Sequence, residues 1–139
     1  MNWKFTGDKP IYAQIIEHIQ TSIATGAYPS GEGIPSVRVL ALEAGVNPNT
    51  MQKALSELEA MGLLLTQRSS GRTVTDDGKL IENLKDNLAR VQINGFFAGM
   101  KNLGFDEREA IGMLSGYLDE GLGPAKGSGG SDVVKKEVN

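Results

Sequence analysis

Four polar side chains between residues 49 and 53 carry the chemistry needed to read DNA. Asn49 and Gln52 bear amides, which donate and accept hydrogen bonds and so match adenine in the major groove. Thr50 adds a hydroxyl, and Lys53 adds a cation that suits contact with the phosphate backbone. The alternative is that Asn49 only completes a helix start. For Gln52, a base edge, a phosphate and solvent stay open as partners.

These side chains belong to a segment, residues 35–62, that is typical of two short helices joined by a tight turn. Gly45 suits the left-handed conformation that ends a helix, Asn47 suits an N-cap, and Pro48 suits the first helical position. Because the apolar residues recur at helical spacing, the polar ones are left on the opposite face. The segment therefore predicts a helix-turn-helix motif. Its apolar positions are Leu40, Ala41 and Ala44 in the first helix, and Met51, Ala54, Leu55, Leu58 and Met61 in the second.

A short β-hairpin is expected directly after the second helix. Residues 63–68 form a brief apolar run, Ser69, Ser70 and Gly71 reverse the chain, and residues 72–75 return as a second strand. A hairpin in this place is called a wing. Arg68 and Arg72 flank its turn, which favours contact with phosphates or the minor groove over plain surface charge.

The remaining pattern predicts three more helices. One begins at Pro10 and carries an apolar stripe from Tyr12 to Ile23, which indicates a supporting role in the core. A second spans about residues 79–100, and a third follows Asp106, which with Glu109 forms a capping signal. Since the last two helices cannot bury both apolar faces alone, we expect them to pair with the same helices of a second copy.

The predicted fold class is therefore mainly α with a small β-hairpin wing. We expect a winged helix-turn-helix DNA-binding domain over residues 1–76, a short two-helix dimerisation domain over residues 77–123 and a flexible tail over residues 124–139. An aromatic and methionine cluster in the second domain either packs as core or lines a small effector pocket. Its members are Phe96, Phe97, Met100, Phe105 and Tyr117.

Composition excludes several classes of function. The chain has 139 residues and no cysteine, and its one histidine, His18, has no His or Cys partner for a metal. Neither a glycine-rich phosphate loop nor a Ser-His-Asp set occurs, so we expect no enzyme activity and no cofactor.

No apolar run spans a membrane, and the N-terminus lacks the core of a secretory signal, so a cytoplasmic location is expected. The net charge of −3 is unusual for a DNA-binding protein, but the placement of the charges governs local contact.

Several ordered blocks in the first half of the chain resemble the GntR family of bacterial transcription regulators. The blocks are residues 10–15, 28–31, 34–41, 45–50 and 54–59. The Val-Asn-Pro-Asn-Thr turn at residues 46–50 and the short C-terminal part are similar to the YtrA subfamily. The resemblance implies a winged helix-turn-helix dimer without a large effector domain. Regulators of that group are often repressors.

The resemblance also implies roles for single residues. Arg38 falls at the arginine that touches DNA from the first helix of the motif, and its position one turn inside that helix favours this over simple solvation. Asn47, Asn49 and Thr50 fall at the start of the recognition helix, Gln52 at a base or phosphate contact, and Gly71 at the wing tip. The chain departs from the family pattern at Gly33, Val39, Ser69 and Thr73, which bears on the wing contacts.

We therefore expect a cytoplasmic, homodimeric repressor that binds a pseudo-palindromic operator in double-stranded DNA. Two alternatives come from other classes. The acidic net charge fits a winged-helix module that binds proteins, and the cluster around Phe96 fits a sensor that holds a small ligand between dimer helices.

Overall fold

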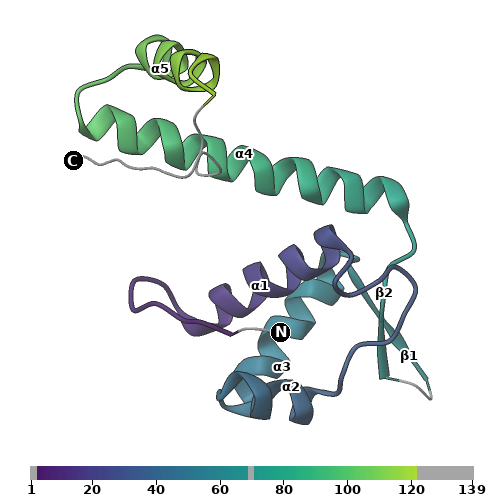
Figure 1. Ribbon diagram of the computed structural model, residues 1–139. Helices are drawn as coiled ribbons and strands as arrows, with labels where there is room; N and C mark the ends of the chain where they lie inside the picture. The colour runs from purple at the N-terminus through teal and green to yellow at the C-terminus, as the bar shows by residue number, and fades with distance from the viewer. Residues whose placement is uncertain (1–2, 69–70, 122–139) are drawn as a thin grey trace. The chain divides into compact units, whose positions relative to one another are not determined.

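The computed structural model describes residues 3–68 and 71–121, so the predicted tail at 124–139 and the turn residues Ser69 and Ser70 lie outside the described residues. The chain divides into two compact units, one up to Arg90 and one from Val91 onward. The division falls inside α4, whereas the predicted boundary at residue 76 falls just before that helix. The elements in order are α1 Ile11–Thr25, α2 Val37–Ala44, α3 Pro48–Ala60, β1 Leu64–Gln67, β2 Gly71–Val74, α4 Gly78–Asn102 and α5 Glu107–Asp119 (Figure 1).

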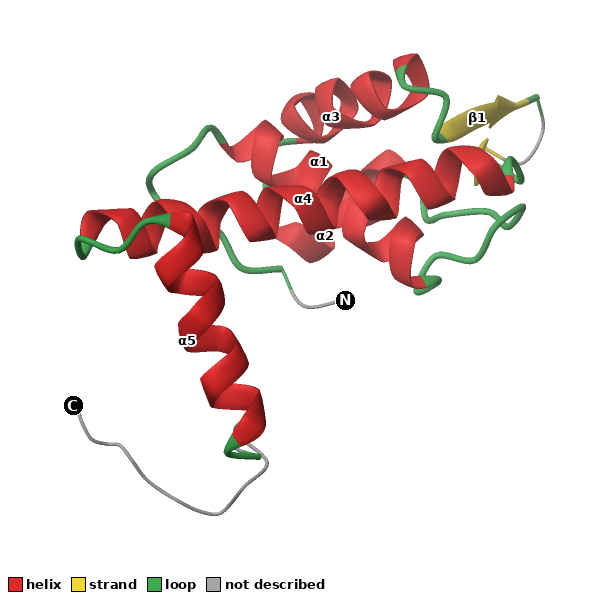
Figure 2. Ribbon diagram, turned by 90° about the horizontal axis from the view of Figure 1, so that it is seen from above, coloured by secondary structure: helices red, strands yellow, loops and turns green. Residues whose placement is uncertain are grey.

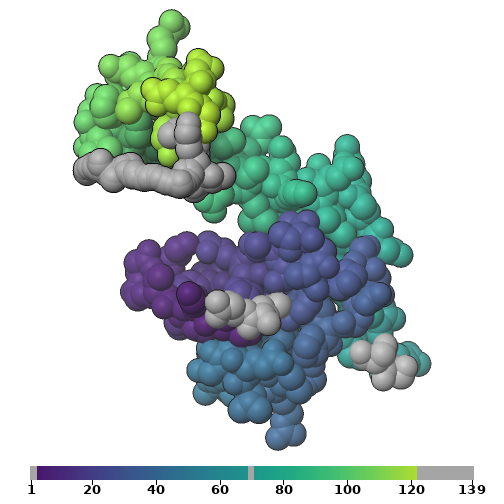
Figure 3. All heavy atoms as spheres, viewed as in Figure 1, coloured from purple at the N-terminus to yellow at the C-terminus, as the bar shows by residue number. Residues whose placement is uncertain are grey.

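Helix α1 supports α3 through the core of the first unit. Ile15 and Ile19 on α1 and Leu55 on α3 are fully buried, and the two helices lie in direct contact (Figure 3). The helix ends at Gly26, which has φ of 83° and donates its N–H to Ile23 O at 3.2 Å. The apolar stripe of α1 thus forms the surface on which α3 packs, and α2 packs on α3 in turn.

The two helices of the predicted helix-turn-helix motif are α2 and α3. Ser36 caps α2 by accepting the Val39 N–H at 3.2 Å, and Gly45 ends that helix with φ of 70°. Asn47 caps α3, because its Oδ1 accepts the Asn49 N–H at 2.7 Å. The expected roles of Gly45 and Asn47 are therefore confirmed, and Met51, Ala54, Leu55 and Leu58 are buried as expected. The expectation for Met61 was wrong, because this residue follows the last turn of α3 and is 41% exposed.

The wing is an antiparallel pair of strands, β1 and β2, that lies beyond the C-terminal end of α3 (Figure 2). A third segment pairs with β2, since Gly31 N–H donates to Val74 O at 2.9 Å and Ile34 N–H donates to Arg72 O at 3.0 Å. An isolated bridge joins Gly33 to Thr73 within this pairing. The sequence shows no sign of this third segment. The pairing is a finding of the structure.

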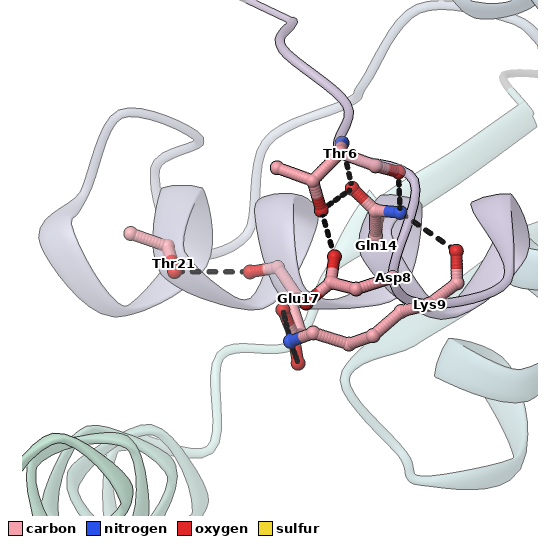
Figure 4. A network of polar contacts seen from close by, with 6 residues as sticks. All are labelled: Thr6, Asp8, Lys9, Gln14, Glu17 and Thr21. Carbon is pink, nitrogen blue, oxygen red and sulfur yellow. Dashed lines mark hydrogen bonds and ion pairs between the residues drawn. The ribbon is translucent and has the colours of Figure 1, made fainter. Parts of the chain in front are cut away.

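The segment before α1 is fixed to the helix by one buried amide. Gln14 is 9% exposed, accepts the Thr6 N–H at 2.8 Å, and donates to the backbone oxygens of Thr6 and Lys9 (Figure 4). The Thr6 hydroxyl also donates to Asp8, which holds the pKa of that carboxyl below its usual value. Because Pro10 offers no side-chain cap, this network fastens the start of α1.

The first part of α4 belongs to the core of the first unit through Leu84, with Leu80, Ile81 and Leu88 packed against the same core. In the second unit, α5 begins with the predicted capping box, in which Asp106 and Glu109 each bind the other's N–H at 2.8 and 2.9 Å. Only Ala110 is buried in this unit among the described residues. Large apolar side chains there stay exposed: Val91, Ile93, Phe96, Leu103, Ile111, Met113, Leu114, Tyr117 and Leu118.

Candidate nucleic-acid interface

The polar face of α3 is built as the spacing predicts. Asn49, Gln52 and Lys53 are exposed and Thr50 is half-buried, while Met51 on the opposite face is fully buried. Burial of the apolar stripe fixes the rotation of the helix about its axis. Asn49, Gln52 and Lys53 are thereby presented outward together, with Thr50 at the edge of the same face, as a recognition helix requires.

Two of these side chains are held in place by neighbours. Gln52 Nε2 donates to Ser56 Oγ at 3.1 Å, one turn further along α3. The Lys53 ammonium lies 4.0 Å from the centre of the Tyr12 ring on α1, close enough for a cation–π contact. These contacts already restrict the rotamers of both side chains in the free protein. Binding to a partner would therefore cost less side-chain entropy. The contact with Tyr12 was not foreseen from the sequence.

Arg38 and the start of β2, near the tip of the wing, border a common hollow. The hollow has a volume of about 440 Å³ and is lined by Ile34, Pro35, Ser36, Val37, Arg38, Gly71 and Arg72. Three residues assigned to DNA contact from distant parts of the sequence thus come together. Arg38 is exposed on α2, and no ion pair to a described residue engages its guanidinium.

The two wing arginines have different surroundings. Arg68 is exposed at the end of β1, and among the described residues no acidic side chain pairs with it. Arg72 lies 3.4 Å from a carboxylate oxygen of Glu59 on α3, and only 17% of its side chain is exposed. Gly71 has φ of 75°, a conformation that L side chains rarely adopt. Arg68 thus has no acidic partner in the described part of the chain, whereas Arg72 is engaged by Glu59.

His18 has a structural setting. Its ring stacks on Trp3 with the ring centres 4.2 Å apart, and burial lowers the pKa of His18. Among the described residues no cluster of His, Cys, Asp and Glu side chains is arranged to hold a metal ion. None of the described helices has the length and apolar character to cross a bilayer.

The apolar cluster of the second unit forms an open groove of about 280 Å³ lined by Phe96, Met100, Met113, Leu114 and Tyr117. Phe96, Met100 and Tyr117 are among the predicted pocket residues. Phe97 and Phe105 are not in the lining; Phe97 packs against Phe96 with ring centres 5.5 Å apart. The sequence-based prediction of the pocket did not include Met113 and Leu114, which α5 contributes to the lining.

A recognition helix with an outward polar face, a supporting α2 and a paired hairpin define a winged helix-turn-helix DNA-binding protein. Comparison with known proteins agrees. The model of the bacterial regulatory proteins of the gntR family matches residues 11–74. The HTH-type transcriptional regulator YhcF of Bacillus subtilis is 34% identical over 121 residues, which is 87% of this chain and 100% of the relative. The HTH-type transcriptional repressor YtrA of the same organism is 36% identical over 98 residues, which is 66% of this chain and 75% of the relative.

Solved structures show the same likeness. A GntR family transcriptional regulator from Listeria monocytogenes superimposes with a TM-score of 0.72 at 38% identity, covering 80% of this chain and 97% of that one. The DNA-binding domain of AraR in complex with operator ORX1 superimposes with a TM-score of 0.50 at 30% identity. The match covers 54% of this chain and 96% of that one. This chain belongs to the GntR family. It is a transcriptional regulator with a DNA-binding GntR domain, as the resemblance implied.

Proposed function

We propose that the protein is a cytoplasmic, homodimeric repressor of the YtrA type that binds a pseudo-palindromic operator. The observation that carries the proposal is the exposed polar face of α3, formed by Asn49, Thr50, Gln52 and Lys53 above a buried apolar stripe. In this proposal Asn49 and Gln52 bond to base edges in the major groove, and Lys53 sets the position of the helix through a phosphate.

Arg38, Asn47 and Arg68 hold the DNA backbone in this proposal. The hollow between α2 and the wing, which Arg38 and Gly71 border, has room for a phosphate group. The exposed Arg68 extends the contact along the wing, where Gly71 permits close approach of the duplex. The family resemblance and the relative named as a repressor support this assignment.

A second copy of the chain is the proposed partner of the second unit. Leu114 and Tyr117, which line the apolar groove, are 44% and 51% exposed. A contiguous exposed apolar patch of this kind is typical of a surface that binds another protein. Pairing of two copies would present two recognition helices to half-sites about one helical turn, roughly 34 Å, apart. A small effector in the same groove is the competing assignment.

Sedimentation with matched variants tests the dimer. We expect Leu114→Lys to shift the protein from dimer to monomer, because a charge would enter the apolar contact. Leu42→Lys is the control, since Leu42 is 83% exposed on α2. A wild-type monomer, or a Leu114→Lys variant that stays dimeric, would refute this part of the proposal.

DNA binding itself is tested by selection of duplexes from a random-sequence pool with the wild-type protein. Enrichment of a sequence with two inverted half-sites is the expected result. Fusion of the selected duplex to a reporter promoter then separates repression from activation, with loss of reporter output expected on expression of the protein.

A further inference from the structure

One carboxylate on the recognition helix binds both strands of the wing. Glu59 Oε2 accepts a hydrogen bond from the Thr66 hydroxyl on β1, and Glu59 Oε1 lies 3.4 Å from Arg72 Nη2 on β2. Thr66 and Arg72 are direct partners across the hairpin. Glu59 therefore ties a matched pair of residues, one from each strand, to the C-terminal part of α3.

The tie is more enclosed than the other ion pairs that the structure describes. The side chains of Arg72 and Glu59 are 17% and 25% exposed, against 48% and 55% for Lys9 and Glu17. Burial weakens screening by salt and water, so this pair is stronger than a surface pair of the same geometry. Arg72 Nε is also buried, and no described group accepts its proton. Most of the arginine side chain is therefore enclosed by protein.

The contacts of Glu59 lie near the tip of the hairpin, where they can determine its orientation. The strands have four residues each, and a hairpin this short has little stability of its own. Beyond the Thr66–Arg72 pair only the Gln67–Gly71 pair remains before the tip. The backbone oxygen of Arg72 is fixed separately by the Ile34 N–H at 3.0 Å. Arg68 lies beyond all of these contacts, so its direction depends on how the hairpin is held.

We propose that Glu59 is a positioning residue that sets the wing against the recognition helix, and that Arg72 is its anchor and not a phosphate contact. The wing is then aligned in advance, so that Arg68 meets the same duplex that α3 occupies. The inference rests on the proposed function, because this alignment serves DNA binding.

The direction in which Glu59→Gln changes DNA affinity distinguishes a positioning role of Glu59 from simple repulsion of phosphates. Removal of an acidic group strengthens the attraction of a protein for phosphates. If Glu59 were only a carboxylate near the interface, Glu59→Gln would therefore tighten DNA binding. Under the proposal, Glu59→Gln weakens binding, because the wing loses its tie. Glu57→Gln is the matched control, since Glu57 is exposed two residues earlier on the same helix.

Binding is measured by fluorescence anisotropy with the duplex that the wild-type protein selects from a random pool. We expect Glu59→Gln to weaken binding about 5-fold, as the loss of a partly buried ion pair implies. Glu57→Gln should leave binding equal or tighter. Arg72→Gln should weaken binding by the same factor, Arg72→Lys should restore it in part, and the double variant should be no worse than either single one.

The salt dependence tells an anchor from a phosphate contact. A lost phosphate contact lowers the slope of log affinity against log salt by about 0.9. We expect Arg68→Gln to show this change and Arg72→Gln to leave the slope as in the wild type. A lowered slope for Arg72→Gln would overturn the assignment of that residue.

Hydrogen exchange of the wing amides tests the tie without DNA. We expect faster exchange at Thr66, Gln67 and Arg72 in Glu59→Gln, and unchanged exchange in Glu57→Gln. Unchanged exchange in Glu59→Gln, or tighter DNA binding by that variant, would overturn the proposal. If the wild-type protein selects no duplex, the proposed function fails, whereas the exchange result still decides whether Glu59 holds the wing.

Discussion

Replacement of Arg38 by alanine is expected to weaken binding to every duplex, with an effect that shrinks as salt rises. Arg38 is exposed on α2, and no described acidic residue pairs with it. Its removal therefore leaves no unpaired buried group, and the free energy of unfolding should change by less than about 0.5 kcal/mol. Any loss of affinity then reports the contact with DNA.

The magnitude follows from one phosphate contact. Such a contact contributes about 0.9 to the slope of log affinity against log salt. Raising salt from about 50 to about 200 mM is a fourfold change, and four raised to the power 0.9 is about 3.5. The ratio of wild-type to variant affinity should therefore be about 3.5-fold smaller at the higher concentration.

Anisotropy titrations over this salt range, with the selected duplex and with a random-sequence duplex, measure both slopes. Arg90→Ala is the control, because Arg90 is an exposed arginine on α4 paired with Asp86 at 2.8 Å. Equal slopes for wild type and Arg38→Ala would refute the phosphate contact. A loss confined to the selected duplex would show that Arg38 reads sequence.

Three further outcomes are expected from the contacts of the first unit. Asn47→Ala removes the cap of α3 and should lower the free energy of unfolding by about 1 kcal/mol in denaturant titrations, with no loss taken as refutation. Burial lowers the pKa of His18, so the unfolded chain binds its proton more tightly. Stability should therefore fall as the pH drops from above 6.5 through the lowered pKa, and His18→Phe, which keeps an aromatic ring on Trp3, should lose that part of the pH dependence in thermal melts. Gln14→Leu should lower the free energy of unfolding by about 2 kcal/mol, since it leaves backbone groups of the N-terminal segment unpaired; an unchanged midpoint in urea would contradict this.

The helix-turn-helix motif was predictable because its signals are local. Asn47, Pro48 and Gly45 each suit one backbone position, and the apolar spacing of α3 sets which face is buried. The outward direction of Asn49 and Gln52 follows from these features alone. The fold class and the polar face of the recognition helix thus required no knowledge of distant contacts.

Contacts between residues far apart in the sequence were not predictable. The role of Glu59 has no signal in the sequence, because nothing in its neighbours reveals that β1 and β2 return beside it. The pairing of Gly33 with Thr73 likewise depends on how the loop before α2 meets the wing. Met113 joined the groove for the same reason, since the turn between α4 and α5 decides which residues face each other.

The most direct test of the account is the sequence preference of Asn49→Ala. Asn49 is exposed on α3. Its backbone N–H, and not its side chain, forms the capping hydrogen bond with Asn47, so the substitution keeps the cap. Selection from the same random pool should show that the variant has lost its preference at one base pair in each half-site, worth about 1 to 3 kcal/mol, while the other positions are unchanged. An identical preference in variant and wild type, or no enrichment by either protein, would contradict the claim that this face of α3 reads DNA.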